Sequence, residues 1–174
     1  MEELVKYLNK KSLSNFDILK LTNNNTKIIV YPELKDYNTI DEVLEPYGSA
    51  VLLYLTNKNY GHWVCIIKQP NNIIEFFDSY GYKPDHQLKF VNEQTRKHLK
   101  QTVPHLSYLL YNSPYKVVYN DVKLQKKKKD INTCGKHCAL RIVLKHINID
   151  DYVDLFNNYK VDPDTLVSLL TAFI

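Results

Sequence analysis

The stretch from residue 61 to residue 81, GHWVCIIKQPNNIIEFFDSYG, decides the fold. Its two apolar runs, 62–68 and 73–78, lie on either side of the turn-forming residues QPNN, a pattern that predicts a β-hairpin. A third apolar run, 50–56, precedes them. Near-continuous apolar runs with short connections predict a central, mostly antiparallel sheet with at least one buried face. Residues at the ends of these strands are therefore held on a rigid element.

Helices are predicted on both sides of this hairpin. The segment CGKHCALRIVLKHI, which begins at Cys134, places Leu140, Leu144 and Ile147 at helical spacing. Cys134 is thus expected at or just before the start of a buried helix. The fold class is α+β, with further strands expected at 27–31 and 115–119 and helices at 2–8, 15–21, just after Thr39, 85–100, 104–111, 151–159 and 163–173.

Length and composition fit one globular domain, residues 1–174, with 44% hydrophobic and 24% charged residues. The N-terminus is charged and amphipathic, and no apolar run is long enough to cross a membrane, so we expect a soluble intracellular protein without a membrane partner. Three cysteines without a CxxC pair argue against a disulfide framework. No glycine-rich phosphate-binding motif is present.

Cys134 is the candidate nucleophile. At a helix N-terminus, free backbone N–H groups and the helix dipole favour thiolate and lower the thiol pKa. Gly135 beside it allows close backbone approach, and the Cys134 N–H is free to donate to an oxyanion. The alternative is an inert cysteine at a helix end. Cys65 and Cys138 are expected in the core.

His62 and Asp78 are the candidate base and orienting group. If the hairpin turns around residue 70, positions near 62 and 78 lie opposite each other. A carboxylate bonded to one ring nitrogen fixes the tautomer in which the other nitrogen accepts the thiol proton. Singly, His62 could be structural and Asp78 a turn former. Together with Cys134 they predict a nucleophile, a base and an orienting residue.

A zinc site is the weaker interpretation of this region. Cys134, His137 and Cys138 could supply ligands, but structural zinc normally takes four, from two spaced pairs, and no second pair is present.

Three sequence blocks resemble the adenain-like cysteine peptidases, which include the SUMO-specific proteases and have the chain order His, Asp, Cys. The blocks are GHW at 61–63, FFDSYG at 76–81 and TCGKHC at 133–138. They look most like the small proteases of virophages, Maverick-type elements and large DNA viruses, and the resemblance covers residues 50–145. It implies a papain-like core in which a central sheet packs against the nucleophile helix.

The resemblance also implies an activity. A viral endopeptidase of this kind cleaves precursor proteins during virion maturation, often beside small residues such as glycine, in the virion and in the host-cell cytoplasm at the virus factory. It needs no metal or other cofactor. Family members use a glutamine before the cysteine in the oxyanion hole. Gln125 fits, although it precedes Cys134 by nine positions, a longer gap than usual; Asn132 is the other candidate donor.

Partner and alternative functions follow from the same resemblance. Adenoviral relatives are stimulated by DNA, and the run Lys126, Lys127, Lys128 and Lys129 could contact it, with a solvated loop as the plainer account. We expect a monomer. An isopeptidase acting on ubiquitin-like modifiers is the main alternative, followed by an acyltransferase with the same triad. From another class, a catalytically silent binding module would retain the sheet without the chemistry.

Overall fold

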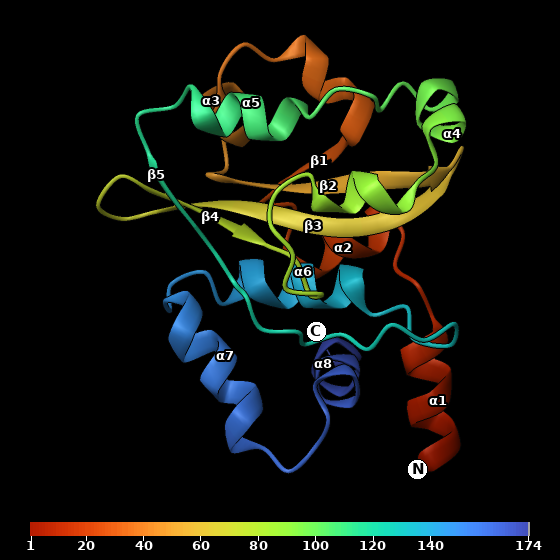
Figure 1. The fold of residues 1–174 in the computed structure, drawn as a ribbon. Helices are drawn as coiled ribbons and strands as arrows, with labels where there is room; N and C mark the ends of the chain where they lie inside the picture. The colour runs from red at the N-terminus through yellow and green to blue at the C-terminus, as the bar shows by residue number, and fades with distance from the viewer. Residues whose placement is uncertain (174) are drawn as a thin grey trace.

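A five-stranded sheet with helices on both faces forms the body of the protein in the computed structural model, which describes residues 1–173 (Figure 1). The strands lie in chain order across the sheet. The elements are α1 (Glu2–Lys10), α2 (Asn15–Leu21), β1 (Lys27–Val30), η1 (Tyr31–Asp36), α3 (Ile40–Leu44), β2 (Ser49–Asn57), β3 (Tyr60–Gln69), β4 (Ile73–Phe77), η2 (His86–Phe90), α4 (Glu93–His98), α5 (His105–Tyr111), β5 (Lys116–Tyr119), α6 (Cys134–Val143), α7 (Ile149–Asn158) and α8 (Pro163–Thr171).

The three central strands pair antiparallel, as the apolar runs predicted, whereas both outer strands pair parallel to their neighbours. β2 with β3 and β3 with β4 are antiparallel. β1 with β2 and β4 with β5 are parallel. Parallel neighbours need a crossover connection, and here η1 with α3 and η2 with α4 and α5 provide the two crossovers. The hairpin pattern gave no signal for these outer pairings.

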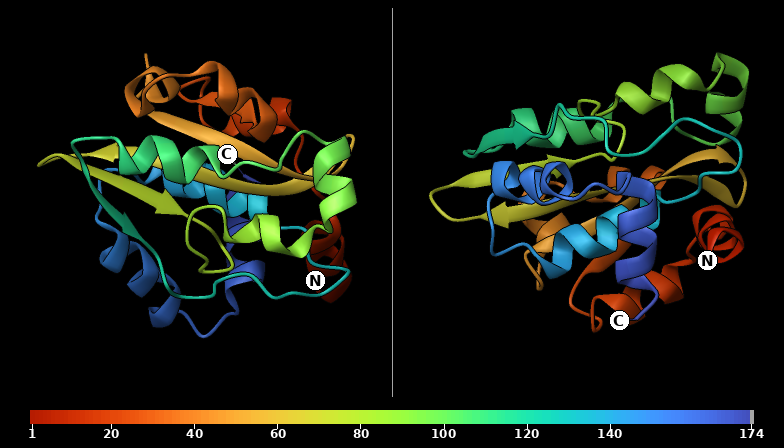
Figure 2. Two further views of the ribbon diagram at one scale, coloured as in Figure 1. Left: turned by 45° about the horizontal axis from the view of Figure 1, so that its top comes forward. Right: turned by 90° about the horizontal axis from the view of Figure 1, so that it is seen from below.

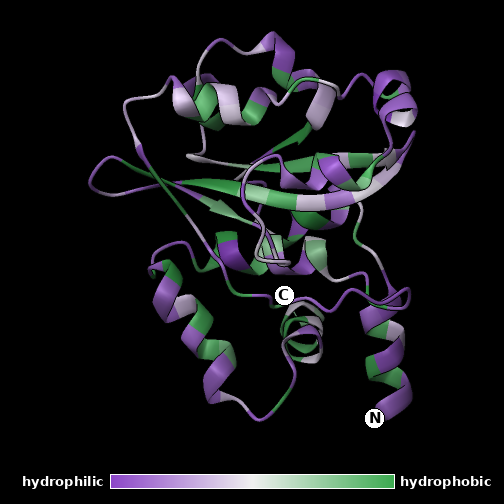
Figure 3. Ribbon diagram, in the orientation of Figure 1, coloured by the Kyte–Doolittle hydropathy of each residue, from purple (hydrophilic) through white to green (hydrophobic). Residues whose placement is uncertain are grey.

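Helices cover both faces of the sheet, so the central strands are buried on both sides. One apolar cluster joins β2 to β4 with α2, α6, α7 and α8, and the other joins the opposite face with η1, α3 and α5. The further views show α6 lying along one face and α5 along the other (Figure 2). Apolar residues concentrate on the central strands, while α1 and α4 are largely hydrophilic (Figure 3).

Helix α6 is buried along almost its entire length, including its charged residues. Arg141 is fully buried and forms a two-bond ion pair with Glu75 of β4, at 2.7 Å through Nε and 2.8 Å through Nη2. Lys136 donates to the carbonyls of Leu8 and Lys11 at the end of α1, at 2.5 and 2.6 Å. Because α6 is fixed to the sheet and to α1, its first residue, Cys134, has a fixed position.

The prediction of one continuous helix over 85–100 is wrong, because the segment forms two separate helices, η2 and α4. Asp85 has a left-handed φ of 64°, and a 3₁₀ helix, η2, follows it. Val91 is extended, and Asn92 then starts α4 by accepting a hydrogen bond from the Thr95 N–H. An extended residue and a new N-cap therefore divide the segment.

Within residues 1–173, no helix has the length and apolar character needed to cross a bilayer.

Candidate active site

His62 and Asp78 form a buried hydrogen-bonded pair, although they do not lie directly opposite each other in the hairpin. His62 Nε2 lies 2.8 Å from Asp78 Oδ1. The strands pair Cys65 with Phe77, so the hairpin centre is residue 71 rather than 70 and Asp78 stands two positions short of the place opposite His62. Because side chains alternate with a period of two, this diagonal offset keeps both on one side of the hairpin and within reach.

Neighbouring groups fix the orientation of both members of this pair. The backbone N–H of Tyr80 donates to Asp78 Oδ1 at 2.8 Å, and the ring of Tyr80 stacks on His62 at a centroid distance of 4.5 Å. Asn120, just after β5, accepts from the Asp78 N–H at 3.0 Å and donates to the Asp78 carbonyl at 2.7 Å. The imidazole is thereby held between a carboxyl group and an aromatic ring.

Cys134 is the first residue of α6 and is 9% exposed. Burial alone would raise the pKa of its thiol, but the hydrogen bond and charge of His62, with the N–H groups of Trp63 and Gly135, together hold that pKa below its ordinary value. Since Nε2 of His62 is bonded to Asp78, Nδ1 is the nitrogen available to Cys134.

The pKa of His62 moves in the opposite direction. Burial would lower it, but the charge and hydrogen bond of Asp78, followed by those of Cys134, raise the pKa of His62 to about 10. Because the imidazole pKa is raised and the thiol pKa is lowered, a proton shared by the two groups lies on His62, which favours the thiolate–imidazolium pair over the neutral pair. Such a pair is an activated nucleophile.

The two candidate oxyanion donors occupy different positions. Gln125 is buried; its Oε1 accepts from Ser79 Oγ at 2.7 Å and its Nε2 donates to the Ile131 carbonyl at 3.3 Å, which leaves one of its two amide hydrogens for another acceptor. Asn132 lies at the edge of the cleft described next, and its Nδ2 donates to the Lys10 carbonyl at 2.9 Å.

An open cleft of about 540 Å³ begins at Cys134. Gly61 and Trp63 line it together with Cys134. The Trp63 Nε1–H donates to the Leu13 carbonyl at 3.2 Å, which ties the indole to the segment before α2. Its apolar lining comes from β1, β2, β3 and the segment before α2, namely Leu13, Ile28, Val30, Leu53, Leu55 and Trp63. Polar residues complete the lining, namely Ser12, Ser14, Asn15, Lys58, Asn59, Tyr60 and Asn132. A peptide segment could lie along this lining.

The run of four lysines is not a uniform basic patch. Lys126 Nζ lies 3.4 Å from the Asp162 carboxyl. Lys127 Nζ lies over three aromatic rings, at 5.3, 4.5 and 4.0 Å from the centroids of Tyr80, Tyr82 and Phe90. Lys128 and Lys129 are exposed. Within residues 1–173, Lys128 and Lys129 are thus the two lysines of the run whose exposed side chains make no ion pair, hydrogen bond or cation–π contact.

The remaining cysteines occupy the core, as expected. Cys65 and Cys138 are fully buried, and burial, then contact with Cys65, raises the pKa of the Cys138 thiol well above its ordinary value. No group of three or more His, Cys, Asp or Glu side chains suited to a metal ion occurs in the described part of the chain. Cys134 is therefore the thiol whose surroundings favour reaction.

The fold is shared with a viral protease of known structure. The crystal structure of the ASFV pS273R protease and that of its selenomethionine form match with TM-scores of 0.51 and 0.52, at 13% and 15% identity, over 94% of this chain and 67% and 68% of that chain. The C-terminal Ulp1 protease domain in complex with the yeast SUMO orthologue gives a TM-score of 0.46 at 16% identity, over 97% of this chain and 80% of that one. The papain-like α+β fold expected from the sequence is confirmed.

The sequence itself places the chain in a virophage protein family. It is 49% identical over 175 residues to "Uncharacterized protein V9" of Sputnik virophage, covering 98% of this chain and 99% of V9. No protein-family model matches the chain. The chain belongs to the family of protein V9, and its homologue is a viral protein, as the resemblance in the three blocks implied.

Sequence reasoning missed the residues that support the triad. Asn120 contacts Asp78 from outside the three blocks. Ser79 contacts Gln125 and lies within the second block, but no motif marked it as a supporting residue. Asn120 follows the predicted strand 115–119, and a polar residue at a strand end was the available signal. Asp164 contacts the loop before Cys134 from α8 and had no signal beyond its place near a predicted helix start.

Proposed function

We propose that this protein is a cysteine endopeptidase that cleaves viral precursor proteins during virion maturation, acting in the virion and in the host-cell cytoplasm at the virus factory. The observation that carries the proposal is the pairing of His62 Nε2 with Asp78 Oδ1 at 2.8 Å beside a thiol, Cys134, whose pKa that same histidine lowers. Membership in a virophage family and the fold shared with a viral protease support a viral substrate.

The first half of the proposed reaction forms an acyl-enzyme. Cys134 gives its proton to His62 Nδ1, and the thiolate attacks the carbonyl carbon of the scissile peptide. The oxyanion accepts hydrogen bonds from the Cys134 N–H, which a helix start leaves free, and from Gln125 Nε2. His62 then protonates the leaving amine as the C–N bond breaks, and a thioester remains on Cys134.

The second half releases the acid. His62, now neutral, takes a proton from water, and the hydroxide attacks the thioester carbonyl. The C–S bond breaks as the oxyanion collapses, and the thiolate and imidazolium re-form as the ion pair. Asp78 stabilises the imidazolium in both halves by its bond to Nε2.

The cleft favours an extended peptide with apolar side chains as substrate. Leu, Ile, Val and Trp side chains form the apolar part of its lining, polar residues lie around them, and Cys134 belongs to the lining as well. Burial of apolar side chains against this part of the lining would provide binding energy.

Thiol labelling combined with turnover tests the proposal. The purified protein is treated near neutral pH with a haloacetamide, and the modified cysteines are mapped by mass spectrometry, with Cys65 and Cys138 as internal controls. We expect selective labelling of Cys134 that slows sharply in His62→Ala. Cys134→Ala should abolish cleavage of peptides with apolar residues before a glycine. Equal, slow labelling of all three cysteines, or cleavage that persists in Cys134→Ala, would contradict the proposal.

The substrate is identified by comparing two protein samples. Virion structural proteins incubated with wild type or Cys134→Ala are searched for new N-termini by mass spectrometry. New termini that require Cys134 support a maturation protease. Release of ubiquitin-like proteins from a C-terminal fluorogenic amide, without cleavage of virion proteins, would instead support the isopeptidase.

DNA stimulation stays a prediction, and the structure narrows where to test it. Since Lys126 and Lys127 have internal contacts, Lys128 and Lys129 are the side chains free to meet phosphates. Turnover is measured with and without duplex DNA at low and high salt. A salt-sensitive increase that the double change of Lys128 and Lys129 to Glu removes would support stimulation; an unchanged rate would favour a solvated loop.

A further inference from the structure

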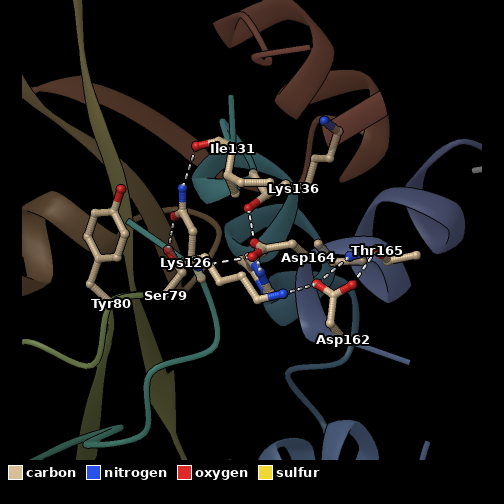
Figure 4. Close-up of polar contacts among 12 residues, drawn as sticks. Ser79, Tyr80, Lys126, Ile131, Lys136, Asp162, Asp164 and Thr165 are labelled. Carbon is tan, nitrogen blue, oxygen red and sulfur yellow. Dashed lines mark hydrogen bonds and ion pairs between the residues drawn. The ribbon is translucent and has the colours of Figure 1, made fainter. Parts of the chain in front are cut away.

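A buried carboxyl group in the last helix holds both ends of the loop that precedes Cys134. Asp164, the second residue of α8, is fully buried. Its Oδ2 accepts from the Lys126 backbone N–H at 2.9 Å, and its Oδ1 accepts from Thr133 Oγ1 at 2.5 Å (Figure 4). We call these two hydrogen bonds the Asp164 bridge. Lys126 directly follows Gln125, and Thr133 directly precedes Cys134.

We propose that Asp164 is a positioning residue that fixes the separation of the two oxyanion donors, Gln125 Nε2 and the Cys134 N–H. This inference rests on the proposed peptidase function. Asp164 touches neither substrate nor thiol; it acts through Lys126 and Thr133, each one residue away from a donor. A carboxyl group suits this role because its two oxygens accept from both ends of the loop at once.

The loop between Lys126 and Thr133 adds residues to the chain without moving its two ends apart. Lys127 to Asp130 are exposed, and the loop is closed internally by the Lys128 N–H to Lys126 carbonyl bond at 3.0 Å and the Ile131 N–H to Lys128 carbonyl bond at 3.1 Å. The Asp164 bridge holds the two ends of this exposed loop together, next to the start of α6. Gln125 can therefore serve Cys134 despite the gap of nine positions.

A second anchor holds Gln125 from the opposite side. The Gln125 N–H donates to the Ser79 carbonyl at 2.8 Å, and Ser79 Oγ donates to Gln125 Oε1 at 2.7 Å. Ser79 directly follows Asp78. Gln125 is thus attached to the hairpin that carries Asp78 and, through Lys126, to α8, so that neither its backbone nor its amide can rotate freely. Such fixed donors are what oxyanion stabilisation requires.

Asp164 is not needed to start its own helix. The N-cap of α8 is Asp162, whose side chain accepts from the Thr165 N–H at 3.3 Å and from Thr165 Oγ1 at 2.5 Å. His137 Nε2 lies 3.5 Å from Asp164 Oδ1, and burial lowers the pKa of His137, which keeps this neighbour neutral at pH 7. The carboxyl group of Asp164 is therefore directed to the loop rather than to helix capping.

Asp164→Asn tests the proposal, with Asp162→Asn as its matched control. Asn keeps the size of the side chain but replaces one acceptor oxygen by a donor, so the charged bridge becomes a neutral one in which Thr133 Oγ1 has to accept rather than donate. Thr133→Val, which removes the Oγ1 bond outright, is measured beside it. Asp162→Asn makes the same change two residues away, at a half-exposed N-cap where Asn is equally suitable. The readouts are kcat and KM on a peptide, the rate of Cys134 alkylation by iodoacetamide, and binding of a peptide aldehyde.

The two kinds of reagent separate positioning from a general structural effect. Alkylation uses the thiolate but forms no oxyanion, whereas turnover and aldehyde binding both place an oxygen in the oxyanion hole. In Asp164→Asn we expect kcat to fall roughly tenfold to a hundredfold, since complete loss of one oxyanion donor costs about 10²–10³. Aldehyde binding should weaken in parallel, with KM and alkylation within about twofold, and Asp162→Asn should resemble wild type.

Two results would overturn the inference. Unchanged kcat and aldehyde binding in folded Asp164→Asn and Thr133→Val would show that the bridge does not position the donors, and a parallel loss of alkylation and kcat would show a structural role. If Asp164→Asn does not fold, Thr133→Val decides alone, with Thr133→Ser as its control: Val should lower kcat and Ser, which keeps the hydroxyl, should restore it. Absence of Cys134-dependent turnover in wild type would refute the proposed function itself.

Discussion

Replacing Gly61 by alanine should separate β2 from β3 immediately beside His62. A Cβ at position 61 would lie 1.8 Å from the Tyr54 carbonyl oxygen, 2.7 Å from the Tyr54 carbonyl carbon and 3.0 Å from Leu55 Cα. These are backbone atoms of the paired strand and cannot rotate away. Relieving the contact from 1.8 Å to at least 3.0 Å requires a backbone displacement of about 1.2 Å.

The displacement falls where the sheet is already irregular. The β2–β3 ladder pairs Leu55 with Gly61 and then Asn57 with Tyr60, so one residue of β2 is unpaired at this point. Overpacking of this kind costs about 1–3 kcal/mol of the free energy of unfolding. Because His62 is the next residue, its ring would move relative to Cys134 by a similar distance. A shift of about 1 Å at a catalytic group can cost on the order of a hundredfold in rate.

Gly48→Ala is the control for this experiment. No atom lies within 4 Å of a Cβ at Gly48, but its φ of +72° strains any other residue, at a cost of about 1–3 kcal/mol. Both variants are unfolded with urea, and kcat/KM is measured per folded molecule on a Cys134-dependent peptide substrate. We expect both to lose stability and only Gly61→Ala to lose about a hundredfold in kcat/KM. A folded Gly61→Ala protein with kcat/KM within threefold of wild type would refute the reasoning.

The remaining predictions concern pH and the buried ion pair. The rate should rise with pH as Cys134 loses its proton, at a pH below the ordinary thiol range, and fall again near pH 10 as His62 loses its proton, because the pKa of His62 is raised to about 10. The same raised pKa stabilises the folded protein fully at a pH below the unfolded value of 6.5, and this contribution is lost as the pH rises through about 10. Both are measured as kcat/KM and as urea stability across the pH range; a rate that keeps rising above pH 10 would contradict the ion pair. Arg141→Met should cost about 3–5 kcal/mol in urea unfolding because it leaves Glu75 buried without its cation, and adding Glu75→Gln should recover most of that loss. Equal stability of the single and double variants would show that the two side chains act independently.

The parts of the fold that could be predicted are those with local signals. The hairpin from β3 to β4 follows from two apolar runs around QPNN, and the start of α6 from the helical spacing after Cys134. The parallel outer strands could not be predicted in this way, since a crossover pairing depends on where β1 and β5 return in space rather than on their own sequences. The division of 85–100 depends on Asp85 in a left-handed conformation, which a polar helical pattern does not indicate.

The residues of the candidate site also fall into two groups, those with a local sequence signal and those whose contacts depend on the completed fold. His62, Asp78 and Cys134 stand at strand and helix ends, positions that local patterns identify, and the structure bonds His62 to Asp78 and places it where it lowers the pKa of Cys134. Asn120 bonds a residue 42 positions away in sequence. Contacts at that separation depend on the completed fold, and a single polar residue gives no local pattern from which to predict them.

Gln125 shows most directly why a spacing rule and a structure can differ. Counting residues left Gln125 and Asn132 as alternative donors, because the nine positions between Gln125 and Cys134 are a longer gap than usual. In the structure the ends of the loop, Lys126 and Thr133, meet the same carboxyl group, so the distance between Gln125 and Cys134 is set by Asp164 and not by the number of residues between them. Insertions in an exposed loop are tolerated when its ends are held, because closing a somewhat longer loop costs little additional entropy. Shortening the exposed lysine segment should therefore leave turnover nearly unchanged so long as both bonds to Asp164 can form, whereas losing one of those bonds should lower turnover even at full loop length.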